Sequence, residues 1–210
     1  MFVRDCMTAN PITVRPDSDP LAALALLKAG CFRHLPVLDN VGKLVGIVDR
    51  ADIELFLSKA GSPGVYKRNY HVEQVMTSPV EFVPPDCPLE EAAMRMVRHK
   101  IGSLPVVDSG RLVGIITETD IFKRFAAILG GGTGLLRLTV QVADVPGQLA
   151  ELAGRIAGVQ GNITSVVAYA ASRPGRMNFT LRVEGASKEA LLQTLSSFVG
   201  LEVLHFWGET

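Results

Sequence analysis

The chain has 210 residues, and its 21 basic side chains balance 21 acidic ones, which gives a formal net charge of 0. At about 150 residues per domain, this length predicts one or two domains. Apolar residues make up 48% and charged residues 20% of the chain, a composition that is typical of globular proteins and excludes extensive disorder. A neutral chain lacks the cationic excess that general nucleic-acid binding requires, so we expect no nucleic-acid partner.

Cysteine usage and hydropathy indicate the compartment. Cys6, Cys31 and Cys87 are far apart and form no Cys-x-x-Cys pair, so we expect no metal site and no dithiol redox site. Such a small, odd number of cysteines fits a reducing compartment. The first residues lack the apolar run of a signal peptide, and the longest dense apolar run, residues 21–27, is far shorter than the ~20 residues of a membrane span. We therefore expect a cytoplasmic protein with no membrane partner.

An internal repeat organises the first 128 residues. Four separate blocks return in the same order: Met7-Thr8 as Met76-Thr77, Leu35-Pro36-Val37 as Leu104-Pro105-Val106, Lys43 to Val48 as Arg111 to Ile116, and Asp52-Ile53 as Asp120-Ile121. The offset is 69 for the first block (76 minus 7) and 68 for the last (120 minus 52). A register held over four separate blocks indicates a duplication.

Each copy predicts the same elements in chain order. These are a short strand at 13–14 (82–83), a helix at 21–29 (89–99), a strand at 35–38 (104–107), a strand at 44–48 (112–116) and a helix from about residue 51 (119). Acidic residues and a proline just before residue 21 mark the start of the first helix, and a turn at 39–42 joins the two later strands as a hairpin. A β-α-β-β-α unit of this size is too small to be stable alone, so we expect the two copies to pack as a pseudo-twofold pair.

A different unit follows a glycine-rich segment. The run from Gly130 to Gly134 is not followed by Lys-Ser/Thr, which excludes a phosphate-binding P-loop and favours a flexible linker. Beyond it we expect a strand at 135–143, a helix at 148–159, strands at 163–170 and 178–183, a helix capped by Ser187 and ending near 199, and a strand at 201–207. The order β-α-β-β-α-β predicts a ferredoxin-like sandwich. The fold class is therefore mixed α/β (α+β), with boundaries at 1–71 and 72–129 for the repeats, 130–134 for the linker and 135–210 for the last unit.

The repeated motifs resemble those of the CBS domain. They are Met-Thr-x-x-Pro, Leu-Pro-Val and the run Gly-Ile-Ile-Thr-Glu-Thr-Asp that ends at Asp120. The resemblance covers roughly residues 3 to 128. It implies a tandem regulatory module that binds an adenosine-containing ligand (AMP, ADP, ATP or S-adenosylmethionine) in clefts between the repeats, with no required cofactor.

The resemblance also implies roles for individual residues. The aspartate that ends the last motif binds ribose hydroxyls and its threonine approaches the phosphate, and Thr117 and Asp120 match both positions. A carboxylate can accept from two cis hydroxyls, and a helix N-terminus favours a phosphate. In the first copy Asp52 matches, but Asp49 replaces the threonine. That carboxylate would repel a phosphate, so the first copy's site favours an uncharged nucleoside, needs a bridging metal, or is empty. The alternative is that Thr117 and Asp120 only cap the following helix.

Two basic residues precede the Leu-Pro-Val motif of the first copy. In some nucleotide-sensing relatives the residues at these positions reach ligand phosphates, so Arg33 and His34 are further candidates. Arg33 offers a planar donor fork and His34 a pH-dependent donor; a solvated loop is the alternative. The same resemblance adds a further set of nucleotide-binding candidates: Thr13, Val80, Ser103 and Pro105.

The last unit resembles the ACT domain, a small amino-acid-sensing module. The resemblance rests on Asp144-x-Pro-Gly147-x-Leu149 followed by Gly161-Asn162-Ile163, and it spans about residues 134 to 207. It implies an amino-acid site at Asp144, Gly147 and Asn162, or a unit that serves only for dimerisation, in which case these residues form a turn and a cap. Two CBS domains followed by an ACT domain are also similar to the acetoin-utilisation accessory proteins of bacteria.

The sequence favours a regulatory protein over an enzyme. The four histidines show no metal-ligand spacing, and the chain has no nucleophile elbow, His-Glu-x-x-His or P-loop. We expect a ligand-sensing homodimer, because a four-stranded sheet has edges that need cover, and a regulated protein of unknown identity. The alternatives are a constitutive adaptor or dimerisation protein with empty sites, and a small nucleotide-processing enzyme.

Overall fold

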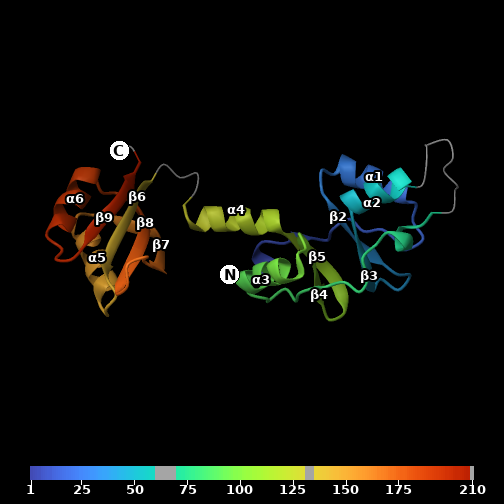
Figure 1. Cartoon of the computed structure of the whole chain (residues 1–210), viewed down its shortest axis with the longest axis horizontal. Helices are drawn as coiled ribbons and strands as arrows, with labels where there is room; N and C mark the ends of the chain where they lie inside the picture. Colours follow the sequence, from blue (N-terminus) through green and yellow to red (C-terminus); the bar gives the residue numbers. More distant parts are fainter. Residues whose placement is uncertain (60–69, 131–134, 209–210) are drawn as a thin grey trace. The chain divides into compact units, whose positions relative to one another are not determined.

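The computed structural model describes residues 1–59, 70–130 and 135–208 (Figure 1). The chain forms two compact units, Met1–Phe122 and Lys123–Thr210. Most of the predicted glycine-rich linker lies outside the described residues. Within the described ranges, no helix has both the length and the apolar character that a membrane span needs.

The first unit consists of two similar halves. The first half contains α1 (Pro20–Ala29), β2 (His34–Leu38), β3 (Leu44–Asp49) and α2 (Arg50–Lys59), and the second contains α3 (Leu89–His99), β4 (Ser103–Asp108), β5 (Arg111–Thr117) and the start of α4 (Glu118–Ile128). In each half the two strands form an antiparallel hairpin. The predicted short strands at 13–14 and 82–83 are reduced to isolated parallel bridges, Val14–Val37 and Val83–Val106.

The capping residues place α1 where the sequence predicts it. Asp19 Oδ1 accepts a hydrogen bond from the Leu21 amide at 2.9 Å, and Pro20 occupies the first helical position. Both features are typical of helix starts. The helix then buries Leu24 and Leu27 in the core of the first half.

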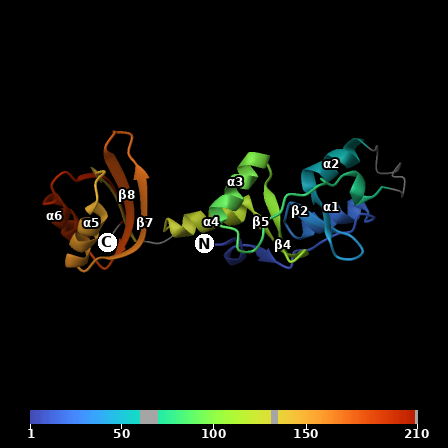
Figure 2. The ribbon, with the colours of Figure 1, turned by 90° about the horizontal axis from the view of Figure 1, so that it is seen from below.

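The segments that precede the two halves are exchanged between them. The first segment, η1 (Val3–Asp5) followed by β1 (Thr8–Ala9), pairs with β5 of the second half, and Val3 is buried in that half's core. Figures 1 and 2 both show the N-terminus beside α3. The equivalent segment η2 (Val72–Gln74) contributes Val72 to the core of the first half. Each half therefore completes the core of the other.

Two equivalent glycines make this exchange sterically possible. Gly114 on β5 lies against the Met7 side chain, and Gly46 on β3 lies against the Met76 side chain. A Cβ at Gly114 would overlap the Met7 sulfur and would lie 3.1 Å from the Thr8 carbonyl oxygen. The methionine of each Met-Thr motif thus packs directly on the backbone of the other half.

We expect Gly114→Ala to lower the free energy of unfolding by about 1–3 kcal/mol, because the added methyl group overpacks the contact with Met7 and Thr8. Gly154→Ala in α5 (Gln148–Gly158) is the matched control, since a Cβ there meets no atom within 4 Å. The control should raise stability by about 0.5–1 kcal/mol through helix propensity. Chemical denaturation followed by circular dichroism measures both. Two stabilised variants would contradict the proposed contact.

The second unit is a ferredoxin-like sandwich, which confirms the prediction. Its elements are β6 (Leu136–Ala143), α5, β7 (Asn162–Ala170), β8 (Arg176–Glu184), α6 (Lys188–Ser196) and β9 (Glu202–Trp207). The antiparallel strand order is β7-β8-β6-β9. Ser187 caps α6 by accepting a hydrogen bond from the Ala190 amide.

Strand alternation in β6 fixes which face of this sheet is covered. Leu138 and Val140 point into a core shared with Leu152 of α5 and Leu191 of α6. The intervening residues, such as Thr139, therefore face the opposite side of the sheet.

Candidate functional site: two cavities between the halves of the first unit

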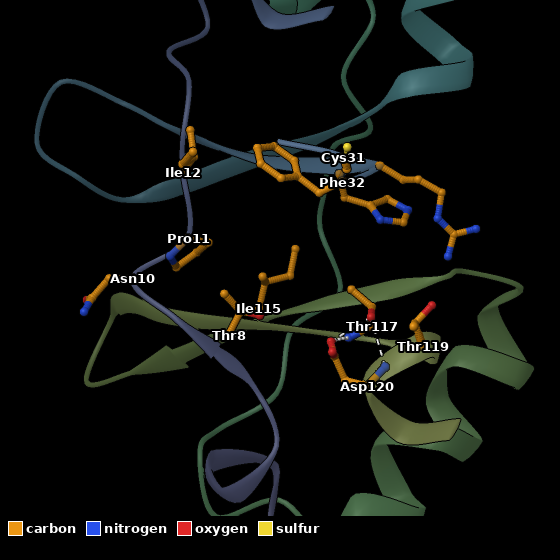
Figure 3. Close-up of a pocket in the computed structure, with 12 residues that line it drawn as sticks. Thr8, Asn10, Pro11, Ile12, Cys31, Phe32, Ile115, Thr117, Thr119 and Asp120 are labelled. Carbon is orange, nitrogen blue, oxygen red and sulfur yellow. Dashed lines mark hydrogen bonds between the residues drawn. The ribbon is translucent and has the colours of Figure 1, made fainter. Parts of the chain in front are cut away.

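The first cavity has a volume of about 390 Å³ and takes its walls from both halves. Figure 3 shows Ile12, Cys31 and Phe32 on one side and Ile115, Thr117, Thr119 and Asp120 on the other. Its full lining is Thr8, Asn10, Pro11, Ile12, Cys31, Phe32, Arg33, His34, Ile115, Thr117, Thr119 and Asp120. Apolar and hydrogen-bonding groups thus converge on one space, as in sites for small organic ligands.

Thr117 and Asp120 form a closed pair at the start of α4. Asp120 Oδ2 accepts from the Thr117 amide at 2.9 Å and from Thr117 Oγ1 at 2.7 Å, and the Asp120 amide donates to Thr117 Oγ1 at 3.3 Å. Thr117 and Asp120 therefore do cap α4, as the alternative from the sequence analysis expects. This arrangement leaves Asp120 Oδ1 without a hydrogen bond among the described residues, and both side chains still line the cavity.

Arg33 brings a positive charge to the same cavity. Its backbone position is fixed, because its carbonyl oxygen accepts from the Arg50 amide at 2.8 Å. Its side chain has no carboxylate within 4 Å in the described part of the chain. The cavity therefore combines one uncompensated guanidinium with the Asp120 carboxylate.

The second cavity has a volume of about 470 Å³ and also takes its walls from both halves. Its charged lining differs from that of the first, with the carboxylates of Asp49, Asp52 and Glu81 alongside His99 and Lys100. Three carboxylates around one space favour a neutral or cationic ligand over a phosphate.

His34 lines both cavities and is held by Asp49. Its Nε2 lies 3.0 Å from Asp49 Oδ2, while Asp49 Oδ1 caps α2 by accepting from the Ala51 amide. The His34 side chain is only 13% exposed, and its ring lies against Gly102 of the other half. Asp49, which stands where the second copy has Thr117, is therefore paired with His34.

Burial lowers the pKa of His34 below its ordinary value of 6.5. Asp49, Glu118 and Asp52 act in the opposite direction, and Arg33 adds to the lowering. The pKa of the folded protein thus lies below that of the unfolded chain. As the pH falls below about 6.5, the unfolded state takes up the proton first, so stability falls with it.

We predict that an NMR titration of the His34 ring gives a pKa below 6.5, and that wild type loses more stability than His34→Gln between pH 6.5 and that value. His99→Gln, at an exposed histidine of the second cavity, is the control for the loss of a histidine side chain. A measured His34 pKa at or above 6.5 would mean that the carboxylates outweigh burial.

The predicted nucleotide-binding residues divide between the two cavities. Thr117, Asp120 and Arg33 line the first. A second group, Asp52, Val80, Ser103 and Pro105, lines the second, and His34 belongs to both. Thr13 lines neither of these cavities, because its neighbour Ile12 occupies the wall instead.

Several wall residues were not predicted as site residues. Some are apolar, such as Phe32 and Ile115, and the sequence does not distinguish an apolar wall residue from a core residue. Thr8 and Thr77 had a usable signal, since both belong to the repeated Met-Thr motif.

Of the three predicted amino-acid-binding residues, Asp144 and Gly147 lie in the loop before α5 and Asn162 is the first residue of β7. Gly147 precedes α5 with φ +92°, a conformation that favours glycine, and the space beside it is open. Asp144 is exposed. Asn162 Nδ2 donates to Glu184 Oε1 at 2.7 Å, so its amide already has a partner. Amino-acid binding there stays a prediction.

The described residues contain no cluster of three or more histidine, cysteine or carboxylate side chains suited to a metal ion. A bridging metal in the second cavity therefore lacks a ready set of protein ligands within the described ranges.

Two family models match the chain. The model of the CBS domain matches residues 3–59 and 72–127, and the model of the TTHA0829-like ACT domain matches residues 131–206. The chain is also 33% identical over 125 residues to L-aspartate semialdehyde sulfurtransferase of Methanocaldococcus jannaschii. That match covers 59% of this chain but only 23% of the relative, so the chain spans about a quarter of that protein's length.

Solved structures of CBS pairs resemble the first unit. The CBS pair of protein MJ0100, in complex with 5′-methylthioadenosine and S-adenosyl-L-methionine, is 32% identical with a TM-score of 0.54, over 60% of this chain and 97% of that one. A putative acetoin utilization protein (AcuB) from Vibrio cholerae is 34% identical with a TM-score of 0.55, over 62% and 93%. CBSX2 in complex with AMP is 30% identical with a TM-score of 0.51, over 60% and 97%.

The duplicated motifs, the two cavities between the halves and the ferredoxin-like second unit agree with these matches. The chain belongs to the CBS-domain family, as a tandem CBS pair followed by a TTHA0829-like ACT domain.

Proposed function

We propose that the chain is a regulatory protein that senses an adenosine-containing ligand in the first cavity. The observation that carries the proposal is the Thr117–Asp120 pair facing an uncompensated Arg33 across a space of about 390 Å³. The complexes of MJ0100 and CBSX2 with adenosine-containing ligands support the same ligand class.

Each part of such a ligand has a counterpart in this cavity. Asp120 Oδ1 is free to accept from the cis hydroxyls of a ribose. Arg33 and the N-terminus of α4 favour a phosphate. Ile12, Phe32 and Ile115 offer apolar surface to a purine ring. AMP, ADP, ATP and S-adenosylmethionine share the adenosine moiety, and the charge of Arg33 favours the phosphorylated members.

We assign the second cavity a different preference. Asp49, Asp52 and Glu81 repel a phosphate, so this cavity favours an adenosyl ligand without one. Bound ligand then biases one arrangement of the halves, by as much as its affinity for the two arrangements differs. A regulated protein reads that arrangement, and the ACT unit serves to form a homodimer or to bind an amino acid.

Asp120→Asn should weaken AMP binding by at least about tenfold, while Asp52→Asn should have a smaller effect, because only the first cavity combines the aspartate with a threonine and Arg33. Asparagine retains an oxygen that caps α4 but removes the charge that a ribose hydroxyl meets. Isothermal titration calorimetry on protein stripped of co-purified ligand measures both. Equal losses would contradict the ranking, and no binding of any adenosyl ligand to wild type would favour the adaptor alternative.

Arg33→Gln should lower the affinity for AMP by about tenfold, since it removes a charge-assisted hydrogen bond to phosphate, and should leave adenosine binding nearly unchanged. Arg111→Gln is the matched control, because Arg111 is exposed at a hairpin and lines neither cavity. Competition binding with AMP and adenosine separates the two effects. A similar loss for both ligands would show that Arg33 does not act on the phosphate.

A further inference from the structure

A third cavity lies within the second unit, on the face of the sheet opposite α5 and α6. It has a volume of about 280 Å³, slightly below the roughly 300 Å³ at which sites for drug-sized ligands begin, so it suits a small ligand. Its lining is Ala126, Leu129, Arg137, Ser165, Val167, Thr180 and Arg182. Arg137, Ser165, Thr180 and Arg182 come from three neighbouring strands, β6, β7 and β8, at paired register positions.

Arg182 is the most buried charged residue of this cavity, with 7% exposure. Its Nε donates to the Leu129 carbonyl and its Nη1 to the Leu135 carbonyl, both at 3.2 Å, and its guanidinium carbon lies 5.6 Å from the centre of the Trp207 ring. These contacts hold the side chain in place. They leave its Nη2 without a hydrogen bond among the described residues.

Arg137 brings a second guanidinium into the same space. Its Nη1 donates to Thr139 Oγ1 at 3.1 Å and to His205 Nδ1 at 3.4 Å. Thr139 Oγ1 is in turn 3.0 Å from Thr180 Oγ1. This network orients Arg137 and connects it to a hydroxyl of the cavity wall.

The two cations have no acidic partner among the described residues. Within the described ranges, neither guanidinium has a carboxylate within 4 Å, and no acidic residue lines the cavity. Burial, and then the charge of Arg137, lower the pKa of Arg182. A buried cation without a counter-ion is costly, and an anion between the two arginines removes that cost.

We propose that this cavity binds a small organic acid that has a carboxylate and no ammonium group, such as a 2-hydroxy acid. The carboxylate lies between Arg137 and Arg182, a hydroxyl contacts Ser165 and Thr180, and the short carbon chain packs on Ala126, Leu129 and Val167. An amino acid is disfavoured, because its ammonium would face two guanidiniums and no carboxylate. The site is therefore distinct from the amino-acid site predicted at Asp144, Gly147 and Asn162.

Trp207 supplies a direct readout, since it is the only tryptophan of the chain and lies over Arg182. The full-length protein is titrated with L-lactate and glycolate while tryptophan fluorescence is followed. Both should give a saturable change at millimolar concentration, and L-alanine should give none. Arg137→Gln should weaken binding by at least about tenfold, and Thr180→Val is a second variant that keeps the side-chain shape. Arg173→Gln, at an exposed turn of the same unit, should bind like wild type.

Three results would overturn the proposal. The first is the absence of a saturable change with both acids in wild type. The second is unchanged affinity in folded Arg137→Gln and Thr180→Val. The third is inorganic phosphate or L-alanine binding as tightly as L-lactate, which would assign the cavity to inorganic anions or to amino acids. None of these results depends on adenosyl ligands, so the test is independent of the function proposed for the CBS pair.

Discussion

The exchange of N-terminal segments is the constraint on which the architecture of the CBS pair depends. Each half has too few strands and helices to bury its own core, so Val3 enters the core of the second half and Val72 that of the first. Close packing makes this contact specific, because Gly46 and Gly114 admit a methionine side chain against the backbone. The two halves are thereby fixed against each other, and the cavities between their edges have defined walls.

The duplication makes two cavities, and substitutions within it have made them chemically different. The Thr117 position of one half is Asp49 in the other, and Asp49 binds His34, a residue that lines both cavities. One cavity therefore presents an uncompensated arginine and the other three carboxylates. At these short distances, charges of opposite sign select ligands of different charge even where the backbone is the same. Under the proposed function, a pair of sites with unlike preferences responds to the ratio of two adenosyl compounds as well as to the amount of one.

The ACT unit places its polar residues unusually. A ferredoxin-like sheet buries one face under its helices, and the other face is normally solvated. Here Thr139 and Arg182 on that other face are almost fully buried, and Leu129 of the 123–130 segment covers Arg182 and accepts a hydrogen bond from it. The cover encloses two arginines that the sheet register brings together, which turns an ordinary polar face into an enclosed anionic-ligand site.

The sequence by itself determined the duplication, the order and approximate bounds of most helices and strands, the ferredoxin-like order of the last unit, and the position of Thr117 and Asp120 at the start of a helix. Those features are local: periodicity, capping residues and a motif of four residues encode them. Only the tertiary structure decided which half each Met-Thr segment completes, that Ile12 rather than Thr13 lines the first cavity, that His34 binds Asp49, and that Arg137 and Arg182 share a cavity. Each of these is a contact between residues far apart in the chain, and a repeat of identical motifs fits pairing within a half as well as pairing between halves. The packing of both cores resolves that ambiguity, because Val3 is buried in the core of the second half and Val72 in the core of the first.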